Sequence, residues 1–168
     1  MRRYLTCGLI LMLAVSLVSC SRQPKLSPKE TVSLYLDELE IIKDPRYYKT
    51  FQAEEKDRDQ EKVNRYAKAL KTTDELVYTQ SSNETARKNT LMLAPLMLMQ
   101  YSNYKVEDVK ADGDSAFVDV TFDSKDMPTE GLGKIGNLIK RPKDKPVVFE
   151  LLKTEKGWRI KDIDSTLD

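Results

Sequence analysis

Residues 115–123 read Ser-Ala-Phe-Val-Asp-Val-Thr-Phe-Asp, and this stretch decides the fold. Its side chains fall into two alternating sets, the typical pattern of a strand with one face on a core. The turn sequence Asp112-Gly113-Asp114 precedes it, and residues 104–111 show the same period with an irregularity between Val106 and Val109. The two stretches therefore predict an antiparallel hairpin. In residues 115–123, one alternating set is Ala116, Val118, Val120 and Phe122, and the other is Phe117, Asp119, Thr121 and Asp123.

A second hairpin is expected nearer the carboxyl end. Residues 147–152 alternate through Val147, Phe149 and Leu151, and Glu155-Lys156-Gly157 turns the chain. Residues 158–163 then supply the last strand, in which we expect Trp158 to be largely buried. The carboxyl half thus predicts four antiparallel strands.

Helical patterns fill the chain before these strands. The sequence Ser27-Pro28-Lys29-Glu30 is a capping box with proline at the first helical position, and Asp44-Pro45 ends that helix. A short helical turn is expected over residues 46–51 and a second helix over residues 56–71. Helices that precede an antiparallel sheet predict an α+β fold, with three N-terminal helices packed on a curved four-stranded sheet.

The third helix begins near residues 81–83 and carries the run Leu91-Met92-Leu93-Ala94-Pro95-Leu96-Met97-Leu98-Met99. A helix that is apolar all round is expected to be buried, so we expect the sheet to curl around this one. Pro95 should kink it or interrupt its hydrogen bonding. The methionines are compatible with an adaptable ligand pocket between helix and sheet, although filled core is the more common outcome.

The amino terminus has the pattern of an export signal. Arg2 and Arg3 precede an apolar run from Leu5 to Val18, which is too short for a confident membrane span. The end of the run, Leu17-Val18-Ser19-Cys20, resembles the lipobox of bacterial lipoproteins. That resemblance implies that the chain is cleaved between Ser19 and Cys20. It also implies that Cys20 carries a diacylglyceryl group and a fatty acyl (palmitate-type) chain. Residues 1–19 are then the signal peptide, 20–26 a lipidated tether and 27–168 a single α+β domain in the cell envelope, on the outer membrane or the outer face of the plasma membrane.

Composition excludes several kinds of site. The chain has no histidine and two cysteines, Cys7 and Cys20, of which one lies in the signal and the other would carry lipid. The usual general base and the usual metal ligands are therefore missing, and we expect no disulfide, metal, cofactor or catalytic residue. The 28 basic and 27 acidic residues are interspersed, which gives no reason to expect a nucleic-acid partner.

Two further patterns lie in the connection before the third strand. Gly131-Leu132-Gly133-Lys134-Ile135-Gly136 fits the glycine pattern of dinucleotide-binding loops, but no strand–helix context surrounds it, so we interpret it as an ordinary loop. Residues 131–146 are also basic and carry aliphatic side chains. They could contact anionic lipid, but packing of the aliphatic side chains on the sheet is the preferred interpretation.

Three segments resemble small bacterial lipoproteins of the cystatin-like, nuclear-transport-factor-2-like (lumazine-binding-like) superfamily, many of them of unknown function. They are Ser27–Val32, Ser115–Val120 and Lys156–Ile163. The resemblance implies a conical sheet wrapped on a long helix. It does not fix an activity, because members include enzymes and plain binding modules.

Two functions therefore remain open. The preferred one is a membrane-anchored, non-catalytic binding or scaffold module for an envelope protein or a small apolar ligand. The alternative is a cavity enzyme of the ketosteroid-isomerase type, which would use a carboxylate and a tyrosine; Asp119, Tyr101 and Tyr104 are of the right types. No motif brings these three together, so none is assigned a role.

Overall fold

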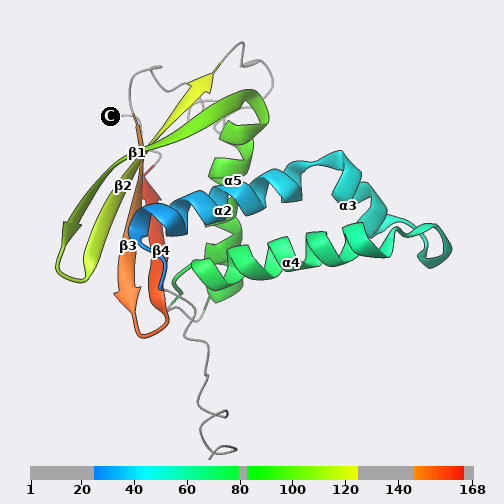
Figure 1. Ribbon diagram of the computed structural model, residues 1–168, viewed down its shortest axis with the longest axis horizontal. Helices are drawn as coiled ribbons and strands as arrows, with labels where there is room; N and C mark the ends of the chain where they lie inside the picture. The colour runs from blue at the N-terminus through cyan, green and yellow to red at the C-terminus, as the bar shows by residue number, and fades with distance from the viewer. Residues whose placement is uncertain (1–24, 80–82, 125–145, 165–168) are drawn as a thin grey trace, which may run out of the picture.

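The computed structural model describes residues 25–79, 83–124 and 146–164. These form an α+β fold in which helices lie on one face of a four-stranded antiparallel sheet (Figure 1). A 3₁₀ turn spans Glu55–Asp57. The α-helices are α2 (Pro28–Lys43), α3 (Pro45–Gln52), α4 (Gln60–Leu76) and α5 (Glu84–Tyr101), and the strands are β1 (Ser102–Asp112), β2 (Ser115–Ser124), β3 (Val147–Thr154) and β4 (Gly157–Asp164).

Both expected hairpins are confirmed. The strand order is β1-β2-β3-β4, and the register of β1 on β2 shifts between Val106 and Val109, where the sequence predicted an irregularity. Gly113 and Gly157 occupy the two turns with positive φ, a conformation that favours glycine. The even-numbered residues of β2 from Ala116 to Val120 are fully buried, so this face of the sheet is the core face.

Helix α2 covers more of the sheet than the apolar helix does, because α2 packs against β1, β2 and β4 whereas α5 packs against β1 and β2. The expectation that the sheet packs mainly on the apolar run 91–99 is therefore correct only in part. The capping box of α2 forms as predicted: Glu30 N donates to Ser27 Oγ, and Ser27 N donates to Glu30 Oε2 at 2.7 Å. Hydrogen bonding to Ser27 lowers the pKa of the Glu30 carboxyl. Four apolar α2 side chains are fully buried: Val32, Tyr35, Leu36 and Leu39. They pack in one cluster with Phe149 and Ile160 of the sheet.

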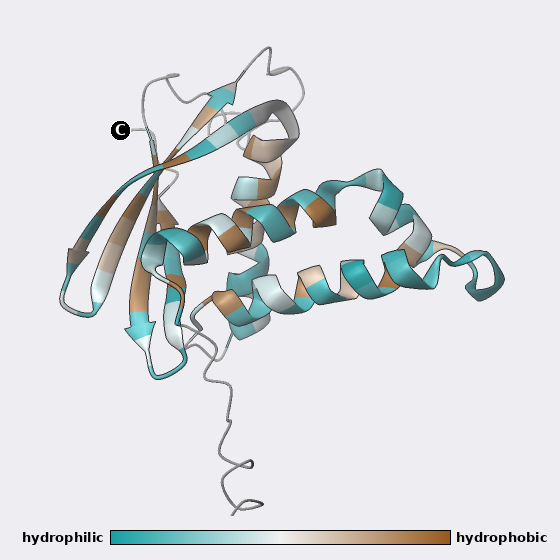
Figure 2. Ribbon diagram, viewed as in Figure 1, coloured by the Kyte–Doolittle hydropathy of each residue, from teal (hydrophilic) through white to brown (hydrophobic). Residues whose placement is uncertain are grey.

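Helices α3 and α4 form a largely hydrophilic arm beside α2 (Figure 2). Residues 46–51 were expected as a single turn but belong to an eight-residue helix, so the described residues hold four α-helices rather than three. Helix α4 starts later than expected, after Asp59 accepts from Lys62 N, and runs on to Leu76. Arg65 of α4 pairs with the buried Glu38 carboxylate, which fixes α4 to α2.

Both outer strands have their edges partly occupied. On β4, Tyr78 N donates to Ile160 O at 2.7 Å, and Arg87 of α5 donates to Lys161 O. On β1, the register shift interrupts the edge, and Lys29 Nζ donates to Glu107 O at 3.2 Å. Such features hinder the addition of a further strand.

Candidate binding groove

The apolar run of α5 divides into a buried side and an open side. Leu91, Leu98 and Met99 are buried, whereas Leu93 is 52% exposed, and Leu96 and Met97 are partly covered. The expectation that this helix is buried all round is therefore wrong for its open side. Leu93 is the most exposed large apolar side chain among the described residues.

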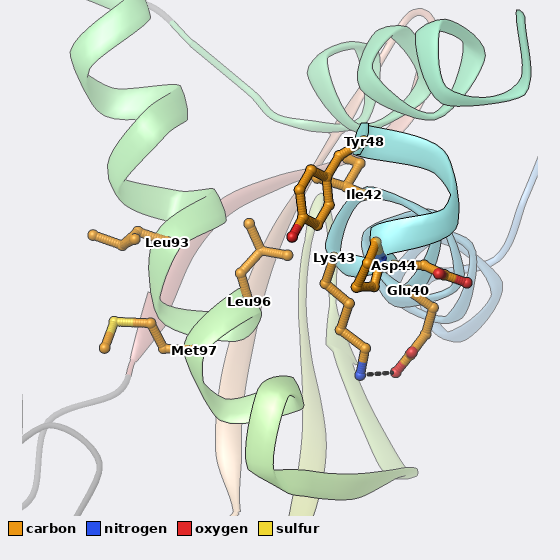
Figure 3. Close-up of a pocket in the computed structure, with 9 residues that line it drawn as sticks. Glu40, Ile42, Lys43, Asp44, Tyr48, Leu93, Leu96 and Met97 are labelled. Atoms are coloured by element: carbon orange, nitrogen blue, oxygen red, sulfur yellow. Dashed lines mark ion pairs between the residues drawn. The ribbon is translucent and has the colours of Figure 1, made fainter. Parts of the chain in front are cut away.

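The open side of α5 borders a groove with a cavity volume of about 700 Å³. Figure 3 shows Leu96 of α5 and Tyr48 of α3 turned toward each other, with Leu93 and Met97 on the other flank of α5. This volume falls within the range of ordinary ligand sites. The lining residues are Leu93, Leu96 and Met97 of α5, Glu40, Ile42 and Lys43 of α2, Asp44 between the helices, and Pro45 and Tyr48 of α3.

The local sequence explains the wall opposite α5. Residue 44 precedes a proline, a position that disfavours helical backbone, and Asp44 is extended with φ −73° and ψ 119°. Its carboxylate then accepts from Arg46 N at 2.9 Å and begins α3 in a new direction. This turn brings Tyr48 over the groove. Residues 46–51 include Tyr47, Tyr48 and Phe51, but nothing local in the sequence indicates which helix these rings face.

The charges at the rim are already paired within the chain. Lys43 Nζ lies 2.8 Å from Glu40 Oε1 and donates to Met99 O at 2.6 Å, near the end of α5. Asp44 pairs with Arg46, and the hydrogen bond from that side chain holds the pKa of the Asp44 carboxyl below its usual value. The rim therefore presents balanced charge, so apolar contact on Leu93, Leu96 and Met97 is what the groove offers a ligand.

The residue types of the isomerase alternative are not brought together. Val118 and Val120, the neighbours of Asp119, are fully buried on the core face, so Asp119 points to the opposite face. Tyr104 is on the core face, where it pairs with Phe122 and donates to Asp37 Oδ1 at 2.7 Å. The side chain of Tyr101 lies outside the described part. Asp119 and Tyr104 therefore cannot act on one substrate atom.

The buried side of α5 contributes to the core that the sheet shares. Leu98 and Met99 are buried in the same cluster as Val118 and Val120. Further cavities lie elsewhere among the described residues. One of about 600 Å³ is lined by residues including Tyr78, Thr154 and Arg159, and one of about 370 Å³ lies between α2, α4 and α5. Burial lowers the pKa of the Arg159 guanidinium.

Several sequence predictions fall outside the described residues. They are the signal 1–19, the cleavage position Ser19, the lipid position Cys20, residues 81 and 82 at the expected start of the third helix, the glycine pattern 131–136 and most of the basic connection 131–146. Among residues 25–79, 83–124 and 146–164, potential ligand side chains do not gather into a group able to hold a metal ion. In the same ranges, no helix combines the length and the apolar character needed to cross a membrane.

Comparison of the chain with protein-family models, with curated proteins and with solved structures finds no match.

Proposed function

We propose that the chain is a lipid-anchored lipoprotein of the cell envelope, a non-catalytic module that binds a protein partner through the groove between α3 and α5. The observation that carries the binding proposal is the exposure of Leu93, 52%, beside a groove with a cavity volume of about 700 Å³. Exposed, contiguous apolar side chains on a protein surface commonly mark interaction sites.

A protein partner fits this groove better than an enclosed small molecule. Leu91, Leu98 and Met99 are buried on the inner side of α5, so the apolar surface that α5 offers a ligand is the outward one, which includes Leu93. A partner helix or loop that contributes apolar side chains could cover both flanks of α5, whereas a small ligand between Leu96 and Tyr48 would leave Leu93 in water. The cavity volume keeps a small apolar ligand as the second candidate.

The proposed anchor rests on the sequence around Cys20. A positive start, an apolar run and Leu17-Val18-Ser19-Cys20 support export, cleavage after Ser19 and lipid on Cys20, with the domain outside the cytoplasm. Two or three acyl chains would hold it stably on a membrane. We further propose the cystatin-like, nuclear-transport-factor-2-like superfamily for the fold; the passage of α2 across one face of the antiparallel sheet supports this.

Site-specific photocrosslinking in the cell tests the binding proposal. A photoreactive residue at Leu93 should give a discrete protein adduct, and the same residue at the exposed Gln52 on the arm should not. Leu96→Glu should abolish an adduct formed from position 93. Phe51→Glu, at a side chain 39% exposed away from the groove, should leave it intact. Equal labelling from positions 93 and 52, or an adduct that survives Leu96→Glu, would overturn the assignment.

Mass spectrometry tests the anchor. The mature chain should begin at a Cys20 that carries acyl chains, and Cys20→Ala should be unprocessed or released from membranes. A Cys20→Ala chain that is still cut after Ser19 and still membrane-bound would contradict the lipoprotein proposal.

A further inference from the structure

The two hairpin turns and the start of α2 lie at the same end of the sheet (Figure 1). Lys153 N beside one turn donates to Asp114 O in the other at 2.7 Å. Near the start of α2, Lys29 Nζ donates to Glu107 O, two residues before Val109 of β1. The far end of α2 reaches the opposite end of β1, where Lys43 donates to Met99 O. We name residues 25–29, 109–117 and 153–158 the hairpin end.

The hairpin end carries apolar side chains that are not fully covered. Val109 is 37% exposed and Phe117 is 40% exposed, which makes them two of the four exposed large hydrophobic residues described. Trp158 is only partly buried, so the expectation that it is largely buried is wrong, and Lys153 Nζ lies 5.9 Å from the centroid of its ring. Aromatic rings and long lysine side chains, each apolar along their length and polar at the tip, suit the boundary between water and lipid.

The charge of this end is mixed. Five exposed lysines lie on it, and exposed acids lie on it or next to it. Attraction to anionic lipid alone would therefore contribute little, and contact with a membrane would need the chain to be held there by another means. The lysines are Lys25, Lys29, Lys110, Lys153 and Lys156, and the acids are Asp108, Asp112, Asp114 and Glu155.

The short segment between Cys20 and α2 can hold this end at a membrane. Only five peptide units join Cys20 to Lys25, and fully extended chain spans at most about 18 Å over that length. Helix α2 has 16 residues and is about 24 Å long, with the groove at its far end. A lipid on Cys20 therefore keeps the hairpin end next to the bilayer. The groove, at the far end of α2, then lies farther from the membrane surface.

We propose that the hairpin end rests on the headgroup layer of a phospholipid bilayer, with Val109, Phe117 and Trp158 at the interface and the groove turned toward the aqueous side. This inference rests on the proposed lipid anchor at Cys20. Tethering raises the effective concentration of a surface whose own affinity is weak. A protein that binds in the groove then approaches from the aqueous phase and not from the membrane that holds the anchor.

Trp158 is the single tryptophan of the chain, so its fluorescence reports on this end alone. The mature lipidated protein is reconstituted into phosphatidylethanolamine–phosphatidylglycerol vesicles and compared with a Cys20→Ser chain that is produced without residues 1–19 and is free in buffer. We expect Trp158 on vesicles to be blue-shifted, quenched by brominated lipid and about two-fold less quenched by acrylamide, as for a residue at the interface. A matched Trp158→Phe/Tyr48→Trp chain, which reports from the groove, should show equal acrylamide quenching in both states.

Vesicle flotation separates the two proposals. Processed protein that fails to float with vesicles contradicts the anchor and therefore the proposed function. Protein that floats while Trp158 keeps the accessibility of the free chain contradicts the orientation alone. The same conclusion follows if the tryptophan of the Trp158→Phe/Tyr48→Trp chain is protected as strongly as Trp158. A Val109→Asp/Phe117→Asp chain should still float but lose the protection of Trp158. Protection that persists in that variant would overturn the role of these two side chains.

Discussion

The hydroxyl of Tyr35 on α2 donates a hydrogen bond to the carbonyl of Leu91 on α5, with 3.2 Å between the oxygens. Leu91 lies four residues before Pro95. Its carbonyl would normally accept a hydrogen bond from the N–H of residue 95, but proline has no N–H to donate. Helix α5 nevertheless continues through Pro95 to Tyr101. A fully buried side chain from another helix thus replaces the missing backbone donor.

We predict that the cost of losing this hydroxyl depends on residue 95. Tyr35→Phe should lower the free energy of unfolding by about 1–3 kcal/mol, because a buried carbonyl is left without a donor. In a Pro95→Ala background the same change should cost about 1 kcal/mol less, because the new N–H can take the Leu91 carbonyl. Urea denaturation of the four chains gives the coupling energy. A coupling energy near zero would show that the hydroxyl does not serve the proline break.

The buried carboxylate of Glu38 provides a second prediction. Its side chain is 8% exposed and pairs with Arg65, which is 34% exposed. Arg65→Leu should destabilise the fold by about 2 kcal/mol, less than for a fully buried pair because water reaches the guanidinium side. Glu38→Leu/Arg65→Leu should recover much of that loss, since no buried charge remains. Thermal melts and urea titrations compare the chains, and a double variant weaker than Arg65→Leu would refute this explanation.

Tyr104 gives the fold an alkaline limit. Burial, and then its hydrogen bond to Asp37, raise the pKa of the Tyr104 hydroxyl above its ordinary value near 10. Since the folded pKa lies above the unfolded one, this contribution to stability is complete below about pH 10 and is lost as pH rises through the folded pKa. Urea midpoints measured from pH 9 to 11 should fall more steeply for the native chain than for Tyr104→Phe. Parallel pH profiles would exclude the effect.

The strands were predictable because their signals are local. The alternation of residues 115–123 and the Asp-Gly-Asp turn define a hairpin without reference to the rest of the chain, and even the shift between Val106 and Val109 follows from the change of phase. The start of α2 was predictable for the same reason, since Ser27 and Glu30 satisfy each other's backbone. Such features need only a few consecutive residues.

The packing order was not predictable from hydrophobicity. Residues 91–99 are apolar all round, yet α2, which also carries Asp37 and Glu40, covers more of the sheet. One apolar face is enough to cover a sheet, and the opposite face is then free to carry charge. A helix that is apolar on every side does not indicate which side faces the core, so the exposure of Leu93 could not be predicted from the sequence.

The groove escaped prediction because its two walls are distant in sequence. Tyr48 and Leu96 meet only after α2 is placed and Asp44 has redirected the chain into α3. The alternating pattern did, however, already put Asp119 out of phase with the core face, and the register of Tyr104 on Phe122 completes the separation of these two residues.

The position of α2 has a consequence for how the chain acquires its structure. Synthesis makes α2 before every other described element, but the sheet residues that cover it, Phe149 and Ile160, come more than 100 residues later. Contacts of such long sequence separation form slowly. The apolar face of Val32, Tyr35, Leu36 and Leu39 therefore stays incompletely covered until the last strand has emerged, and during that interval it can be captured by a chaperone or by another unfinished chain. A chain without residues 157–164 would never complete the cover of α2. Such a truncated chain should accumulate with chaperones or in aggregates rather than as a smaller folded domain.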